Sequence, residues 1–216
     1  MRKVFGWVLL FLMSTIVSFG QKAKPVFEVV PLGVYGGIDE RNLSAYLVAP
    51  IGTKEYVCLD AGTVHSGIEK AIEKGTFSVP SSTVLRQYIK GYCISHAHLD
   101  HVSGLIINSP ADSTKTVYAI APAMKMMQNH YFNDQTWANF GDEGLGKPLK
   151  KYHFETLSFG KTIPISNTSM TVQAFPLSHV NPYESTAFLI KKDNNAILYL
   201  GDTGPDSVEK TTNLAD

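Results

Sequence analysis

The segment SHAHLDHVSGLIINSP gathers three of the chain's seven histidines and one aspartate within six consecutive positions. It directly follows an apolar, strand-like run. Alternate side chains of an extended chain point the same way, so His96 and His98 can leave the end of that strand together and bind one ion. The adjacent pair Asp100 and His101 breaks this alternation, which indicates a turn and ligands for a second ion. The spacing therefore predicts two neighbouring metal ions.

Imidazole nitrogen and carboxylate oxygen are ligands that zinc accepts, and manganese or iron would also fit them. The alternative is a histidine-rich turn with a structural role or none. Four potential ligands within six positions, directly after an apolar strand, argue against that alternative.

Three further polar residues follow strand-like runs. His179 ends the run FPLSH, Asp202 lies in LYLGDTG, and Asp60 lies in VCLDAG. Taken alone, His179 would be a solvated loop histidine, and either aspartate would shape the turn at the neighbouring glycine. Beside the first cluster, we expect His179 and Asp202 to bind metal. We expect Asp60 to orient a ligand histidine through its free ring nitrogen, with turn formation as the alternative.

The elements that must position these residues are short and alternate in type. Pro80 and Pro122 precede or begin helical segments, and Gly91 suits a helix C-cap. Mixed strands and helices of this kind predict a layered α/β fold. Strands are predicted at residues 26–30, 45–48, 56–59, 92–95, 116–120, 152–156, 170–175, 187–190 and 196–200, and helices at 67–74, from 81 or 82 to 91, and at 122–129.

The first twenty residues, MRKVFGWVLLFLMSTIVSFG, join a basic start to an apolar run that ends on small residues. This layout predicts a secretory signal peptide, cleaved before Gln21, and hence a periplasmic or secreted protein without a stable membrane anchor. The alternative is an uncleaved anchor, but residues 4–19 span only about 24 Å as a helix, against a hydrocarbon core of about 30 Å.

The rest of the chain, residues 21–216, suits one hydrolase domain, because 44% of the residues are hydrophobic and 18% are charged. Nineteen basic residues balance nineteen acidic ones, which disfavours a polymeric nucleic acid as partner. An oligomer is compatible with this composition. Cys58 and Cys93 lie in strand-like runs, where export would permit a disulfide and burial would favour free thiols.

The H-x-H-x-D-H run, followed in order by His179 and Asp202, resembles the metallo-β-lactamase superfamily. The longer string HAHLDHVSGLIINSP resembles the signature of the class II cyclic-nucleotide phosphodiesterases, which have Leu99 between the ligands and an Asn-Ser-Pro ending. The resemblance covers about residues 26–204 and implies an αββα sandwich with a dinuclear metal site. It assigns the first ion to His96, His98 and His179, the second to Asp100 and His101, and the bridging position to Asp202.

The resemblance also implies a reaction. Water between two ions becomes hydroxide near neutral pH, and the hydroxide attacks the phosphorus of a 3′,5′-cyclic nucleotide to give the 5′-nucleotide. Asp100 and Asp202 would be the residues tied most closely to catalysis, and the two ions would be zinc. The alternatives are another hydrolase of the superfamily, acting on a lactam, thioester or lactone, and an inactive metal-binding protein.

An aromatic segment concerns the substrate. The stretch NHYFNDQTWANF resembles an aromatic segment of the phosphodiesterases, in which Trp137 would stack on a base and Asn133 and Asn139 would read a purine edge. The alternative is that its aromatic residues pack the core.

The resemblance further implies one more histidine at the second ion, and no histidine follows His179. We therefore expect the sequence to be part of a longer chain, with its second half incomplete.

Overall fold

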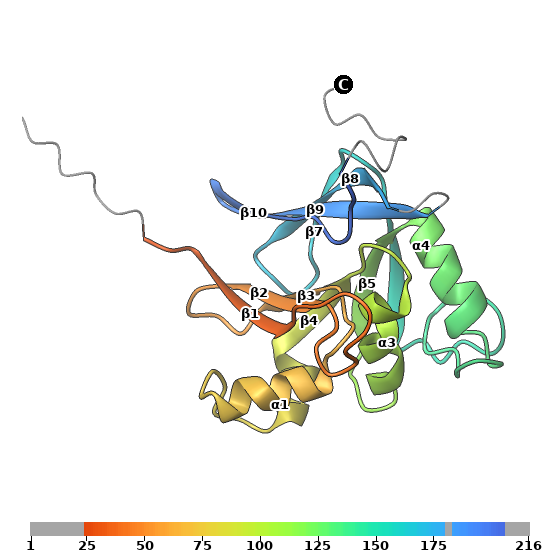
Figure 1. Cartoon of the computed structure of the whole chain (residues 1–216), viewed down its shortest axis with the longest axis horizontal. Coiled ribbons are helices and arrows are strands. Elements are labelled where there is room, and N and C mark those ends of the chain that lie inside the picture. Colours follow the sequence, from red (N-terminus) through yellow and green to blue (C-terminus); the bar gives the residue numbers. More distant parts are fainter. Residues whose placement is uncertain (1–23, 180–182, 206–216) are drawn as a thin grey trace, which may run out of the picture.

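The computed structural model describes residues 24–179 and 183–205 (Figure 1). The predicted signal peptide, residues 1–20, lies outside the described residues. None of the helices in the described part has the length and apolar character needed to cross a lipid bilayer.

The larger sheet has six strands in the order β1-β2-β3-β4-β5-β6. The first three strands pair antiparallel, and β3, β4, β5 and β6 pair parallel. Parallel strands end at the same edge, so the residues that follow β3 and β4 emerge next to each other. The strands are β1 (Phe27–Gly33), β2 (Ala45–Pro50), β3 (Tyr56–Leu59), β4 (Ile89–Cys93), β5 (Lys115–Ile120) and β6 (Tyr152–Leu157).

The smaller sheet has four strands in the order β10-β9-β8-β7. Both β8 and β10 pair antiparallel with β9, so the residues that follow them also leave the sheet at one edge. This arrangement brings His179, after β8, toward Asp202, after β10. The strands are β7 (Thr162–Pro164), β8 (Thr171–Ser178), β9 (Glu184–Lys192) and β10 (Asn195–Tyr199).

The two sheets and the helices form layers, as the alternation of elements predicted. Helices α1 and α3 lie on the side of the six-stranded sheet away from the four-stranded sheet (Figure 1). Residues of both sheets, such as Leu47, Val117 and Phe188, belong to one buried core. The helical elements are α1 (His65–Glu73), α2 (Ser81–Thr83), α3 (Leu99–Asn108) and α4 (Ala121–Met126), with π-helical turns η1 (Val84–Tyr88) and η2 (Met127–Tyr131).

The predicted helix end at Gly91 is wrong. The helical segment stops at Tyr88, and residues 89–93 form β4 between β3 and β5. Glycine at position 91 lets β4 lie close to β5, because a Cβ atom there would lie 2.9 Å from the carbonyl oxygen of Thr116. The ten-residue helix α3 was not predicted, because its first turn carries polar ligand candidates that indicated only a turn.

Cys58 and Cys93 are buried free thiols on the neighbouring strands β3 and β4. In the strand register Cys58 faces Tyr92, and Cys93 faces Leu59, so the two cysteines are not paired opposite each other. Burial raises the pKa of both thiols, which keeps them protonated and makes them part of the core.

A buried carboxylate, Asp112, joins three strands of the larger sheet. It accepts hydrogen bonds from the hydroxyls of Tyr92 on β4 (2.7 Å) and Tyr152 on β6 (2.9 Å). Its other oxygen lies 2.7 Å from Nζ of Lys115 on β5, and both side chains are almost fully buried. Burial lowers the pKa of Lys115, while Asp112 opposes that shift by stabilising the ammonium. This network supports β4, which leads into the histidine cluster.

Replacing Asp112 by Asn should destabilise the domain by about 3–5 kcal/mol, because Lys115 would become a buried charge without its ionic partner. Urea unfolding followed by circular dichroism measures this change. The double variant with Lys115→Met should recover much of the lost free energy of unfolding. A single variant within about 1 kcal/mol of the parent chain would show that the buried pair does not stabilise this sheet.

Candidate metal centre

Asp60 occupies the sharp turn at the end of β3. Its φ is 53°, a left-handed conformation that aspartate tolerates better than most residues. The turn packs directly on the start of α3, because the Ala61 amide donates to the carbonyl oxygen of His101 (2.8 Å). A Cβ atom on Gly62 would lie 2.0 Å from the carbonyl oxygen of Asp100, so only glycine permits this approach. The LDAG motif thus holds α3 against the sheet edge.

The fully buried carboxylate of Asp60 accepts four hydrogen bonds. Ser95 donates both its backbone amide (2.7 Å) and its hydroxyl (2.7 Å), and Tyr199 donates its hydroxyl (2.6 Å). Nδ1 of His101 lies 2.7 Å from the same carboxylate, which assigns the ring proton to Nδ1. The opposite nitrogen, Nε2, therefore faces the site, where it is buried without a hydrogen-bond partner.

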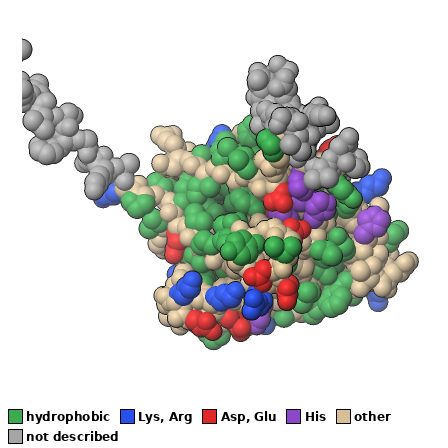
Figure 2. Space-filling model, in the orientation of Figure 1, with side chains coloured by type: hydrophobic (Ala, Val, Ile, Leu, Met, Phe, Trp, Pro, Cys, Tyr) green, Lys and Arg blue, Asp and Glu red, His purple; other side chains and the backbone are tan. Residues whose placement is uncertain are grey.

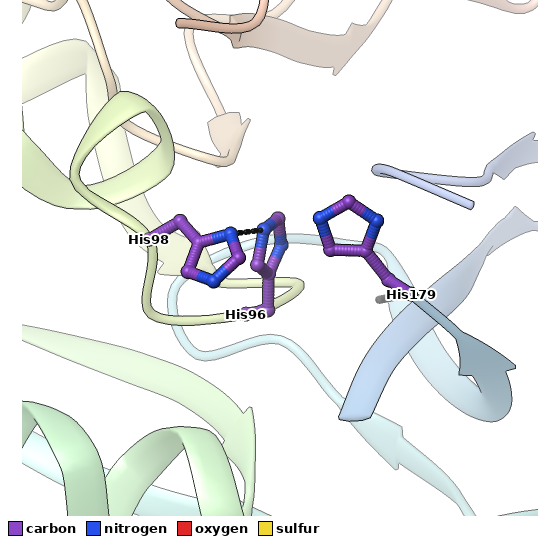
Figure 3. A group of neighbouring side chains, drawn as sticks. All are labelled: His96, His98 and His179. Atoms are coloured by element: carbon purple, nitrogen blue, oxygen red, sulfur yellow. Dashed lines mark hydrogen bonds between the residues drawn. The ribbon is translucent and has the colours of Figure 1, made fainter. Parts of the chain in front are cut away.

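Three histidines form the first group of metal-ligand atoms. One ring nitrogen from each of His96, His98 and His179 lies within 4.8 Å of the others. Figure 3 shows the three rings turned toward one another, two from the loop after β4 and one from the end of β8. Nε2 of His96 lies 3.0 Å from Nδ1 of His98. Three imidazoles with neighbouring lone pairs match the ligand type and spacing of a divalent metal site.

A second group shares His96 with the first. Ligand atoms of His96, His101 and Asp202 lie within 4.8 Å of one another. The carboxylates of Asp202 and Asp100 lie 3.4 Å and 3.5 Å from Nε2 of His101, and the Gly37 amide donates to Asp100 (2.8 Å). Histidine and acidic side chains accordingly meet on one face of the molecule (Figure 2). Five of the six predicted ligands thus belong to these two groups, and the sixth, Asp100, lies beside Nε2 of His101.

The electrostatics of the site favour a bound cation. Burial lowers the pKa of His96 to about 3 and also lowers the pKa of His98, so both rings are neutral and their lone pairs are available. Burial opposes protonation of His101, but the nearby carboxylates of Asp202 and Asp60 raise its pKa to about 10. The adjacent His101 lowers the pKa of Asp202. Two neutral imidazoles, the ionised carboxylate of Asp202 and the buried Nε2 of His101 fit a divalent metal ion, which would displace the second ring proton that the carboxylates favour on His101.

Sequence reasoning missed several residues of this region. Tyr199 and Ser95 bind Asp60, Gly37 binds Asp100, and Tyr183 packs against His98 with ring centroids 4.7 Å apart. The available signals were weak. Ser95 directly precedes His96, and Tyr199 comes three positions before Asp202, but neither spacing identifies a partner.

The residues predicted to contact the substrate base make hydrogen bonds within the protein. Asn139 is fully buried, and its side-chain amide donates to the carbonyl oxygens of Glu143 and Leu145. Asn133 is also buried and accepts the amides of two following residues, while the Trp137 indole donates to Ser109. These contacts order the segment after α4. Substrate binding by the three residues stays a prediction.

The remaining histidines lie outside both ligand groups. His65 pairs with Glu69 one turn further along α1 (3.1 Å), and His153 pairs with Asp142 on the surface (2.6 Å). His130 lies in η2. None of these three belongs to either of the two groups of metal-ligand atoms.

Solved structures show the fold class. Unliganded yeast PDE1 superposes with a TM-score of 0.73 at 20% identity, covering 83% of this chain and 66% of that one. YhfI from Bacillus subtilis, a metallo-β-lactamase fold protein, superposes with a TM-score of 0.59 at 18% identity, covering 85% of this chain and 66% of that one. The chain therefore has the metallo-β-lactamase fold.

Sequence relatives show the family. A probable 3′,5′-cyclic-nucleotide phosphodiesterase of Yersinia pestis is 43% identical over 91% of this chain and 60% of its own length. A 3′,5′-cyclic-nucleotide phosphodiesterase of Aliivibrio fischeri is 42% identical over 94% of this chain and 64% of its own length. The chain thus spans less than two thirds of these relatives. Because the family model for class II cAMP phosphodiesterases matches residues 26–215, the chain belongs to that family.

Proposed function

We propose that the protein hydrolyses 3′,5′-cyclic nucleotides to 5′-nucleotides with two divalent metal ions, expected to be zinc. The observation that carries this proposal is the three-histidine group together with His101, Asp202 and Asp100, whose ligand atoms lie next to it. The family of the chain and the names of its relatives give the substrate class. A small cyclic nucleotide also suits a chain whose formal net charge is zero.

The side chains have separable roles in this proposal. His96, His98 and His179 would hold one ion, and Asp100 and His101 would hold the other. Asp202 would bridge the two. When bound, the ions lower the pKa of water and neutralise charge on the phosphodiester.

Four residues prepare this site without binding metal themselves. Asp60 retains the proton of His101 on Nδ1, so that Nε2 faces the site. Tyr199 and Ser95 hold the Asp60 carboxylate in place. The Gly37 amide donates to the Asp100 oxygen that lies 3.5 Å from Nε2 of His101, and so fixes the direction of this carboxylate. The protein thereby fixes the directions of its donor atoms before any ligand arrives.

Elemental analysis of the full-length protein should find two divalent ions per chain. Product chromatography should show that it converts cyclic AMP to 5′-AMP. Replacing Asp202 by Asn should lower kcat/KM by about 100-fold or more, since loss of an outer-shell partner alone typically costs 10–100-fold. Asp193→Asn, on the exposed turn before β10, is the matched control and should keep activity.

A metal content near one ion in a fully active preparation would contradict the two-ion proposal. Formation of the 3′-nucleotide, or faster cleavage of a lactam, thioester or lactone, would contradict the proposed substrate and reaction.

Replacing Asp60 by Asn should weaken metal binding by about 10–100-fold, because a neutral amide no longer fixes His101 through its Nδ1 proton. Competition with a chromophoric chelator measures this affinity. The matched control is Asp134→Asn, which also changes an aspartate with positive φ that accepts backbone amides, but outside the site. Equal loss of metal affinity in both variants would assign the effect to general destabilisation instead.

We also propose that the protein is exported to the periplasm or secreted, on the basis of the basic and apolar pattern of its first twenty residues. Fractionation of expressing cells followed by mass spectrometry should find the mature chain outside the cytoplasm and beginning at Gln21. A cytoplasmic chain that retains residues 1–20 would contradict export.

A further inference from the structure

A pocket of about 270 Å³ lies directly beside the three-histidine group. The rings of two metal-ligand candidates form one wall, and the first turn of α4 forms another. Tyr183 and Glu184, at the start of β9, complete its rim. Its lining residues are His96, Ala97, His98, Pro122, Ala123, Met126, Tyr183 and Glu184.

We propose that this pocket holds the nucleobase of the substrate and selects bases that carry an exocyclic amino group. The inference rests on the proposed function, since it assumes that the phosphate lies at the metal ligands. A whole drug-sized ligand needs about 300–1,000 Å³. A pocket of about 270 Å³ therefore suits the base alone, with the ribose and phosphate extending toward the histidines.

The walls of the pocket match a flat heteroaromatic ring. Tyr183 is 42% exposed, and its ring stands at 72° to the ring of His98, so it contacts a metal-ligand candidate while much of its surface remains accessible. Met126 and Pro122 supply apolar surface from the α4 side. Stacking between an aromatic side chain and a base is worth about 1–3 kcal/mol and tolerates any base. The walls thus provide affinity without choosing among bases.

Glu184 supplies the selectivity. It is an exposed residue that lines the pocket, and an ionised carboxylate only accepts hydrogen bonds. Carboxylates accept from the amino group of a base, as they do from cytosine in nucleic-acid recognition. Adenine offers such a donor at its 6-amino group, and guanine offers one at its 2-amino group, on another edge of the ring. A base that presents only acceptors at that edge would instead meet electrostatic repulsion.

A second, larger cavity borders Asp100. It measures about 720 Å³, and its lining includes Ile38, Leu99, Ile107 and Glu40. Its lining has no tyrosine, phenylalanine or tryptophan, and of the six metal-ligand candidates it contacts only Asp100. The smaller pocket contacts two ligand histidines and carries an aromatic ring, which is why the base is assigned to it. Glu40 provides a matched acidic residue in the competing cavity.

Calorimetric titration of the zinc-loaded full chain tests this assignment. The two probes are adenosine 5′-monophosphate and purine riboside 5′-monophosphate, which differ only by the 6-amino group. The parent chain should prefer the adenosine nucleotide by about tenfold or more, as expected for a hydrogen bond to a charged group. Glu184→Thr, which suits a strand, should bring the ratio of the two dissociation constants near one. Glu40→Thr should leave that ratio unchanged.

Tyr183→Leu should weaken the binding of both nucleotides by similar factors of about fivefold or more, since stacking does not depend on the amino group. Equal binding of the two probes by the parent chain, no binding of either, or loss of the preference in Glu40→Thr would overturn the assignment. Hydrolysis of cyclic AMP and of bis(p-nitrophenyl) phosphate is measured separately. Failure of hydrolysis with an intact, Glu184-dependent preference would therefore contradict the proposed reaction and leave the base pocket supported.

Discussion

One buried carboxylate, Asp60, determines how the two halves of the site meet. Its partners come from the loop after β4, from helix α3 and from strand β10 of the other sheet. A buried carboxylate without hydrogen bonds would carry a large free-energy penalty, so these donors must all be present at once. The sheet-to-sheet arrangement and the orientation of His101 are therefore parts of a single network.

The topology explains why ligands distant in sequence converge. Strands β3 and β4 are parallel, and β8 and β10 are aligned through β9, so each sheet delivers two polar segments at one edge. The apolar core between the sheets then brings the two edges together. Loops can carry the ligands because the strands beneath them are fixed by burial and by the Asp112 network.

Metal binding and base recognition share side chains in the proposed enzyme. His96 belongs to both ligand groups and also borders the smaller pocket, and His98 links the first ligand group to Tyr183. A substrate held at the ions would thus have its base placed by residues that touch the ion's own ligands. Such direct contact favours precise positioning, because little flexible structure lies between the two subsites. The further histidine expected at the second ion stays a prediction.

Local sequence determined the strands that precede the ligands and the identity of the ligand candidates, because strand periodicity and the H-x-H-x-D-H spacing act over a few residues. It also indicated the layered α/β class. Tertiary structure decided that residues 89–91 join a sheet instead of extending a helix, since pairing with β3 and β5 outweighs the local preference. It also decided the contact of Tyr199 with Asp60, whose positions differ by 139 residues. Folding alone selects such a partner, because the buried carboxylate needs a donor and only the packed sheets place this hydroxyl beside it.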